Sequence, residues 1–282
     1  MTTYSPTIQR FVLAAELKRL REAAGMDSTK VAKQQGWDPS KVSRLENAKS
    51  KRPALRDVSD LLTMYGVTDD REREAILALA RASRERGWWT AYADVFKGLL
   101  PDLEAGATQI QGIETVLVPG LLQTPAYAEA VFRAGRVLDD EGVRRHVEGR
   151  MARQKILWRD SPPVLWAVID EAALRKLVGG PEVMREQLRH LVEVARRPAV
   201  NIQVFPDKAG AHAAMVAPFT IFNFATEQYP SLVYMETPTN PVYQDDREEV
   251  EHYDVIYRQV VAEALPVEES VRYMAELADQ LK

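Results

Sequence analysis

Apolar positions in the N-terminal quarter of the chain recur at the spacing of α-helices. Leu13, Leu17 and Leu20 stand at i, i+4 and i+7 and predict a first helix over roughly residues 8–23, which Gly25 then terminates. Side chains at this spacing share one helical face, and that face has to be buried against other elements. The pattern therefore predicts a helical bundle.

Two short helices are predicted next, joined by a tight turn. Ser28 is expected to cap the first of them, which ends at Gly36. Asp38 is expected to cap the second, with Pro39 at its first position, where a missing N–H costs nothing. The side chains expected to point inward from this pair are Val31, Ala32, Val42 and Leu45.

Two further helices complete the predicted bundle. A basic loop ends at Pro53, and the stretch from Leu55 to Tyr65 carries an apolar face. A fifth helix is expected to begin near Asp69. Residues 88–92 follow, and an α-helix there would put Trp88 and Tyr92 on one face. These aromatic side chains are expected to pack the fifth helix against the rest of the chain, with the binding of a ligand as the alternative.

The pair of short helices within five predicts a helix-turn-helix module. In such modules the second helix enters the DNA major groove, so its outer face has to be small, polar or basic. The residues expected to contact DNA are Ser28, Thr29, Lys30, Ser40, Lys41, Ser43, Arg44, Asn47, Lys49, Lys51 and Arg52. A helical module that docks onto another protein is the alternative interpretation of the same pattern.

The remaining two thirds of the chain alternates strand and helix patterns, which predicts an α+β domain with about five strands. Helices are expected from Thr124, from Glu171 to Gly179, from Pro181, and over the last part of the chain. The segments that read as strands are 108–118, 163–170, 200–205, 218–224, 231–237 and a short edge strand, PVYQ, at 241–244.

Charge is distributed unevenly between these two parts. Residues 1–87 hold 17 of the 37 Lys and Arg and 12 of the 41 Asp and Glu, a net charge of +5, whereas residues 88–282 carry −9. Within residues 28–56 the chain has eight basic residues and two acidic ones. A basic module joined to an acidic body predicts that a polyanion contacts only the N-terminal part, although a solvated helix face has the same composition.

Composition bounds the class of protein. The 282 residues, 46% hydrophobic and 28% charged, suit a globular protein with a sizeable core. The chain has no cysteine, which excludes disulfides and thiolate metal sites. The N-terminal stretch lacks the pattern of a secretory signal and no apolar run approaches the ~20 residues of a membrane span, so we expect a cytoplasmic protein.

Motifs of common enzymes are missing from the sequence. It contains no phosphate-binding glycine loop, no paired-histidine zinc motif and no nucleophile elbow, and its four histidines are scattered. Asp170–Glu171 is explained by a strand that runs into a helix start, and EHYD at 251–254 by a solvated helix face. The loop AGAHAAM at 209–215 is read as a connection between strands, with a cover over a pocket as the alternative. We therefore expect no enzyme, no cofactor and no bound metal.

Several segments resemble one known group of regulators. LAAELKRLREAAGM and VAKQQGWDPSKVSRLENAKSKRP are similar to the Xre-type, lambda-repressor-like helix-turn-helix, which is all α. The segments RGWW at 86–89, LVPGLLQT at 117–124 and LVYMET at 232–237 look like a large actinobacterial family that joins this module to a C-terminal domain of unassigned role. The resemblance implies an antitoxin-like transcription regulator, dimeric, with a small partner protein encoded nearby in many members.

Three positions depart from the pattern of that family. Ser28 and Pro39 stand where members carry glutamine, a side chain that can pair with adenine. Ala48 stands where a glycine is expected. The operator of a relative therefore does not transfer to this chain, and base reading is expected to rest on Lys41, Ser43 and Arg44.

These observations divide the chain into three expected parts. Residues 1–68 form the DNA-binding domain, 69–90 a connecting helix and 91–282 an effector or partner domain that also dimerises. The dimer contact is expected from a sheet edge or from the stripe of Val271, Met274, Leu277 and Leu281, unless that stripe is internal core. The alternative function is an antitoxin-like protein that mainly binds a small neighbour-encoded protein.

Overall fold

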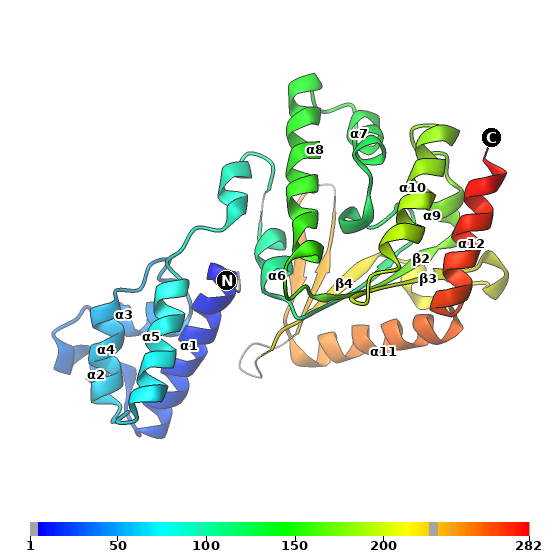
Figure 1. The fold of residues 1–282 in the computed structure, drawn as a ribbon. Coiled ribbons are helices and arrows are strands. Elements are labelled where there is room, and N and C mark those ends of the chain that lie inside the picture. The colour runs from blue at the N-terminus through cyan, green and yellow to red at the C-terminus, as the bar shows by residue number, and fades with distance from the viewer. Residues whose placement is uncertain (1–4, 97, 226–230, 238, 282) are drawn as a thin grey trace. The chain divides into compact units, whose positions relative to one another are not determined.

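The computed structural model describes residues 5–96, 98–225, 231–237 and 239–281. The start of the N-terminal stretch examined for a secretory signal, residues 1–4, lies outside them. The chain forms two compact units, one ending at Thr90 and the other beginning at Ala91 (Figure 1). The first unit is all helical and the second mixes helices with one sheet, which confirms the predicted fold class. Among the described residues, no helix combines the length and apolar character needed to cross a bilayer.

Five helices build the N-terminal unit. They are α1 (Pro6–Ala23), α2 (Ser28–Gln35), α3 (Pro39–Glu46), α4 (Leu55–Met64) and α5 (Asp70–Ala82). Their apolar faces meet in one core, in which Leu17, Val31, Val42 and Leu61 are fully buried. The region predicted as a connecting helix thus contains α5, whose Ile76 contributes to this same core.

Local signals in this unit worked as predicted with one exception. Gly25 and Gly36 adopt left-handed φ values of 65° and 66° where α1 and α2 end, and the Asp38 carboxylate caps α3 by accepting from the Ser40 amide at 2.9 Å. The cap of α2 is Asp27, which accepts from the amides of Thr29 and Lys30, and not Ser28 as predicted. An aspartate one residue earlier satisfies the same amides, so the helix begins at Ser28 itself.

The C-terminal unit contains a six-stranded mixed sheet with the order β3-β2-β1-β4-β5-β6. Its strands are β1 (Gln109–Glu114), β2 (Val164–Asp170), β3 (Val200–Phe205), β4 (Phe219–Asn223), β5 (Leu232–Met235) and β6 (Val242–Gln244). The first three strands run parallel, while β4 pairs antiparallel with β1, and β5 and β6 continue antiparallel. All six segments that the pattern singled out contain a strand, one more than the expected count of about five, and β6 is the edge strand that its flanking prolines predicted.

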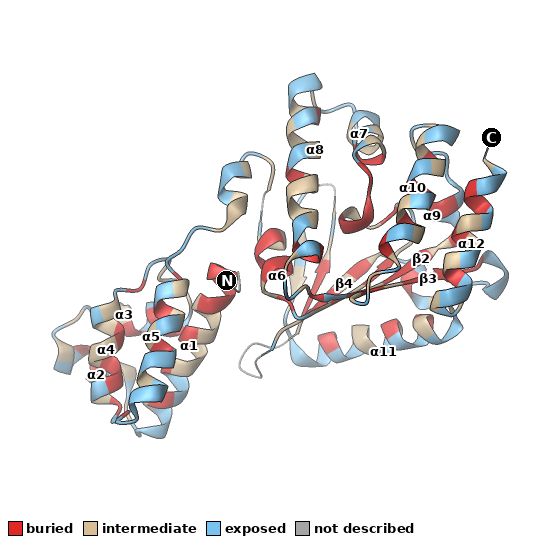
Figure 2. Cartoon of the chain, viewed as in Figure 1, coloured by how far each residue is buried: buried red, intermediate tan, exposed pale blue. Residues whose placement is uncertain are grey.

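Helices cover both faces of this sheet (Figure 1). On one face lies α11 (Arg247–Glu263), whose Val250, Tyr257 and Val260 are buried on the strands. The other face carries α7 (Pro125–Ala134), α8 (Asp140–Gln154) and α10 (Pro181–Val194). Buried residues dominate the strands, whereas α11 is exposed along its outer side (Figure 2). The remaining helices are α6 (Leu100–Gly106), α9 (Glu171–Arg175) and α12 (Val267–Gln280).

Three details of the fold differ from the sequence prediction, and a fourth decides between two interpretations that the sequence left open. The helix α9 ends at Arg175 rather than Gly179, because the next residue, Lys176, already has an extended backbone with a ψ of 121°. Two helices that were not predicted, α6 and α8, occupy 100–106 and 140–154. Residues Trp88–Tyr92 form a 3₁₀ turn, so Trp88 and Tyr92 do not share an α-helical face. The stripe on α12 faces inward through Met274 and Leu277, which are buried where α12 packs on α10 and β3, while Val271 and Leu281 are half-buried.

Candidate functional site

Helix α3 is held in the N-terminal unit by one face only. Val42 and Leu45 are buried in the core, while Ser40, Ser43, Arg44 and Asn47 on the remaining surface are exposed. The helix is eight residues long and begins directly after the three-residue turn that follows α2. A short helix anchored along one side leaves its opposite face available for contact over its full length.

A buried ion pair fixes the C-terminal end of α3 to α1. The Arg21 guanidinium donates to both carboxylate oxygens of Glu46, at 2.8 and 3.0 Å, and to the Met26 carbonyl at 2.8 Å. Glu46 is 5% exposed and Arg21 13%. A two-pronged contact of this kind has a defined geometry, so it fixes the direction in which α3 points.

The predicted DNA-contacting residues gather on the start of α2, on α3 and on the loop that follows α3. Those that are exposed are Thr29, Lys30, Ser40, Ser43, Arg44, Asn47, Lys49, Lys51 and Arg52. Ser28 and Lys41 are half-buried. The region also includes Arg56, which was not predicted and whose side chain is 92% exposed at the start of α4. Its position directly after the basic loop could have identified Arg56 as a further DNA-contacting residue.

The Arg44 side chain is oriented by a short hydrogen-bonded chain. Its Nη1 donates to the Ser40 hydroxyl at 2.7 Å, and that hydroxyl in turn donates to the Asp38 carboxylate. The hydrogen bonds from Ser40 hold the pKa of Asp38 below its usual range. Arg44 is therefore held near the N-terminal end of α3, while four of its five N–H donors have no hydrogen bond within the described part of the chain.

Lys41 lies differently from the free, outward chain that the sequence predicted. Its ammonium group is 2.8 Å from the Asp57 carboxylate on α4 and 4.0 Å from the centre of the Trp37 ring. The side chain is 29% exposed. To reach a DNA base, Lys41 would have to leave both contacts.

A second candidate site is a cavity of about 260 Å³ in the C-terminal unit. It lies on the sheet face opposite α11, under α8, and side chains of one strand face line it in register: Ile110, Gly112 and Glu114 of β1. The segment LVPGLLQT forms another wall, with Leu117, Val118, Pro119, Gly120, Leu121 and Gln123. Sequence reasoning found this segment through its resemblance but did not predict the cavity.

The LVPGLLQT wall is fixed from behind by neutral hydrogen bonds. The Gln187 side chain of α10 accepts from the Thr124 amide and donates to the Leu122 carbonyl, both at 2.7 Å. Gln154 of α8 donates to the carbonyls of Gly120 and Gln123 at 3.0 and 2.7 Å. The wall is therefore built in advance of any ligand.

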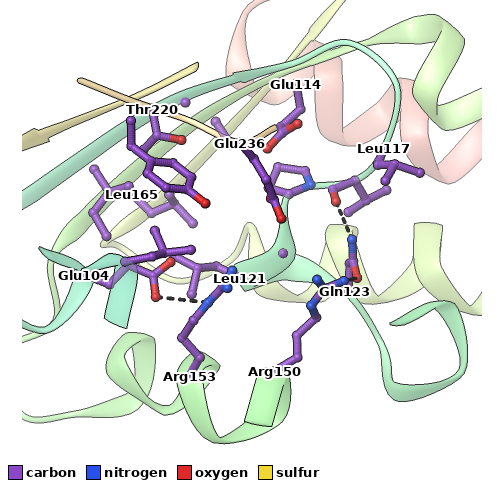
Figure 3. A pocket seen from close by; sticks show the side chains of 18 of the residues that line it. Glu104, Glu114, Leu117, Leu121, Gln123, Arg150, Arg153, Leu165, Thr220 and Glu236 are labelled. Carbon is purple, nitrogen blue, oxygen red and sulfur yellow. Dashed lines mark hydrogen bonds and ion pairs between the residues drawn. The ribbon is translucent and has the colours of Figure 1, made fainter. Parts of the chain in front are cut away.

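Five charged side chains face this cavity (Figure 3). The acidic ones are Glu104 of α6, Glu114 at the end of β1 and Glu236 beyond β5, and the basic ones are Arg150 and Arg153 of α8. Burial raises the pKa of Glu104 and that of Glu114 to about 7 each. Burial also lowers the pKa of Arg150 to about 10. Glu114 and Glu236, at the ends of two apolar strand patterns, were the signal in the sequence, but their convergence depends on the order of the strands.

The motifs considered for catalysis lie elsewhere. Asp170 caps α9 by accepting from the Ala172 amide, as the strand-to-helix interpretation predicted. The buried His212 ring has its Nε2 3.3 Å from the Asp170 carboxylate and its centre 4.3 Å from that of Phe205. The AGAHAAM loop is thus anchored next to β2, and none of its residues lines the 260 Å³ cavity.

Two family models match the chain. Residues 12–76 match a helix-turn-helix domain, the span that contains α2 and α3. Residues 98–276, the greater part of the chain, match a domain of unknown function (DUF5753), and this span contains the cavity. No curated protein and no solved structure matches the chain. The chain therefore belongs to the DUF5753 family and carries a helix-turn-helix domain at its N-terminal end.

Proposed function

We propose that the protein is a sequence-specific DNA-binding transcription regulator of the Xre type, in which α3 enters the major groove. The observation that carries the proposal is the one-sided anchoring of α3. Its apolar side chains are buried, whereas Ser40, Ser43 and Arg44 are exposed on the face that would meet base edges. A helix-turn-helix domain match over the same residues supports this proposal.

Within this proposal, phosphate contacts come from side chains around α3. Lys49, Lys51 and Arg52 follow the helix and are exposed, and Thr29 and Lys30 are exposed at the start of α2. The first amides of α2 already donate to the Asp27 carboxylate. Phosphates near this helix start are therefore bound by the hydroxyl and ammonium groups rather than by the backbone.

Base reading is assigned mainly to Arg44. Arginine can donate two hydrogen bonds to guanine, and Arg44 needs to give up only the Ser40 hydroxyl to do so. Lys41 would have to give up the Asp57 carboxylate, a stronger charge-assisted contact. We therefore assign Lys41 a smaller share of base reading than Arg44.

The regulator is proposed to act as a homodimer. One short helix reaches few base pairs, and two copies that bind half-sites about 34–36 Å apart provide the missing contacts. Since the apolar stripe of α12 faces inward, the edge strand β6 is the remaining candidate surface of the two that the sequence offered. The C-terminal unit is proposed to sense a ligand or a small partner protein and to have no catalytic role.

The test is a titration of the protein's own promoter fragment against wild type and Arg44→Ala. We expect the variant to lose about 1–3 kcal/mol of binding free energy at the specific site, with little change on unrelated DNA. Repeating the titration with the co-expressed product of the neighbouring gene separates this function from the antitoxin-like alternative. Equal affinity of wild type and variant for the promoter would contradict the assignment of Arg44.

A further inference from the structure

The charged groups that line the cavity do not neutralise one another completely. Arg153 pairs with Glu104, whose Oε2 lies 3.0 Å from its Nε. Glu104 is 4% exposed and Arg153 11%, so this pair belongs to the interior. This pair does not neutralise the other three charged groups at the cavity, Glu114, Glu236 and Arg150.

Two carboxylates at the cavity have no partner in the described part of the chain. Neither Glu114 nor Glu236 makes a hydrogen bond or an ion pair there. Both side chains point toward the open space of the cavity (Figure 3). Glu114 is half-buried and Glu236 is exposed. Partial withdrawal of a carboxylate from water without a donor is unfavourable, and burial raises the pKa of Glu114 to about 7, with the charge of Glu236 adding to the rise. A bound cation would provide what these two carboxylates lack.

The third group, Arg150, lacks an anionic partner. Its Nη1 donates to the neutral Gln123 side chain at 2.5 Å, and its guanidinium lies over the Phe132 ring at 4.3 Å. No carboxylate lies within ion-pair distance of it in the described residues. A guanidinium has five N–H donors, and it binds carboxylates through two of them at once. Arg150 is therefore suited to a carboxylate that the chain itself does not provide.

The size and the apolar lining of the cavity restrict the ligand. Its volume of about 260 Å³ is slightly below the range of about 300–1,000 Å³ typical of small-molecule pockets. Apolar side chains line the space between the charged groups, among them Ile110, Leu165 and Phe222. Gly120 also lines it, where a Cβ would lie 2.4 Å from the Arg153 Nη2, so a larger residue would displace that arginine.

We propose that this cavity binds a small zwitterion of the amino-acid type. Its ammonium group lies between Glu114 and Glu236, its carboxylate contacts Arg150, and its side chain occupies the apolar part. The proposal deepens the sensing role given above to the C-terminal unit. The binding event itself does not depend on DNA, so it can be measured separately from the regulator function.

The test uses the full chain and the free proteinogenic L-amino acids as probes. Each is added at millimolar concentration in a thermal-shift series, and those that raise the unfolding midpoint are followed by titration calorimetry. The best ligand is then compared with two matched analogues, the amine that lacks the carboxylate and the acid that lacks the amine. We expect one-to-one binding of the amino acid and binding at least ~10-fold weaker for each analogue, a difference of about 1.4 kcal/mol.

Variants at the two ends of the site sharpen the test. Glu114→Gln and Arg150→Gln are each expected to weaken binding at least ~10-fold. Glu263→Gln, an exposed position on α11, is the matched control and is expected to bind as wild type does. Circular dichroism establishes that each variant is folded, and Glu236→Gln, at an exposed position, replaces Glu114→Gln if that variant does not fold.

Three results would overturn the proposal. They are the failure of every amino acid to bind, unchanged binding in the Glu114 and Arg150 variants, and equal binding of the acid or the amine alone. None of these results affects the promoter titration, which is performed without ligand. Conversely, an intact amino-acid site in a protein that does not bind its promoter would overturn the regulator function alone.

Discussion

Both units of this chain contain a buried ion pair, Arg21–Glu46 and Arg153–Glu104, but they place their other charged side chains differently. In the helical unit Arg44, Lys49 and Lys51 are on the surface, and Arg21 with Glu46 is a buried pair in which the guanidinium contacts both carboxylate oxygens. In the C-terminal unit charged side chains converge on a cavity, and Glu114 there has no partner among the described residues.

This difference separates two uses of charge. Exposed basic groups cost little to fold and act on a large anion that arrives from solvent. Unpaired charges at a cavity destabilise the fold, and such groups are typical of sites that bind or react. Net charge alone, +5 in residues 1–87 and −9 in residues 88–282, predicts the first use but does not reveal the second.

The largest expected effect tests whether the pair in the helical unit is structural. Glu46→Ala leaves the Arg21 guanidinium buried without its carboxylate, and we expect a loss of about 3–5 kcal/mol in the free energy of unfolding. The Glu22 carboxylate lies 3.5 Å from the same arginine, but the Glu22 side chain is 57% exposed. Glu22→Ala should therefore cost under about 0.5 kcal/mol. Urea unfolding followed by circular dichroism measures both. Equal losses in the two variants would show that burial of the pair has no special role.

A pH series tests the carboxylate at the cavity, Glu114, which unlike Glu46 has no ion-pair partner among the described residues. The pKa of Glu114 is raised from 4.5 to about 7, so the folded state holds a proton that the unfolded state has released. Stability should therefore fall as pH rises from about 4.5 to about 7, by on the order of 1.4 kcal/mol per unit of pKa shift. The groups that face it are Glu104, Glu236, Arg150, Arg153 and Tyr234.

Glu114→Gln removes this titration and should be more stable than wild type at pH 8, with a smaller difference at pH 5. Calorimetric unfolding of both proteins across that range measures the difference, in which contributions from groups that do not interact with Glu114 cancel. The same difference at every pH would contradict a raised pKa for Glu114.

A smaller effect concerns backbone conformation, because each unit contains a non-glycine residue with a positive φ. Ala48, after α3, has a φ of 55°, in the left-handed region that favours glycine, and Arg136 in the C-terminal unit has 51°. Ala48→Gly should raise stability by about 0.5–1 kcal/mol, because the strain on Cβ disappears. Ala23→Gly, inside the last turn of α1, should have the opposite sign. Thermal unfolding of the two variants gives the comparison.

The smallest expected change separates phosphate binding from base reading. Lys51→Ala should weaken the binding of all DNA sequences alike and lower the slope of log affinity against log salt by about one. Titrations of a specific and an unrelated fragment at several salt concentrations measure it. A loss confined to the specific fragment would assign Lys51 to base contact instead.

How much the sequence could predict follows from the range of the interactions involved. The helix-turn-helix was predictable because Gly25, Gly36 and Asp38 act on residues within a few positions of themselves. The cap at Asp27 was missed because two neighbouring residues, Asp27 and Ser28, both suit that role. The glycine missing at position 48 was noticed, but the left-handed φ of Ala48 was not predicted from it.

The cavity was beyond sequence reasoning for the opposite reason. Its carboxylates stand at positions 104, 114 and 236, and they converge because β1 pairs with both β2 and β4, an order set by packing across the whole unit. The helix α8, which supplies Arg150 and Arg153, is polar along most of its length and gave no clear apolar period. The α12 stripe had two interpretations, internal core or dimer surface, and only its packing on α10 decided between them.

The central claim, that α3 recognises DNA, is tested most directly by genome-wide mapping of the protein in cells that express wild type or Arg44→Ala at equal levels. We predict discrete occupied sites for wild type that share a sequence pattern with two half-sites, and loss of those sites in the variant. The same sites occupied by both proteins, or no discrete sites for wild type, would contradict it.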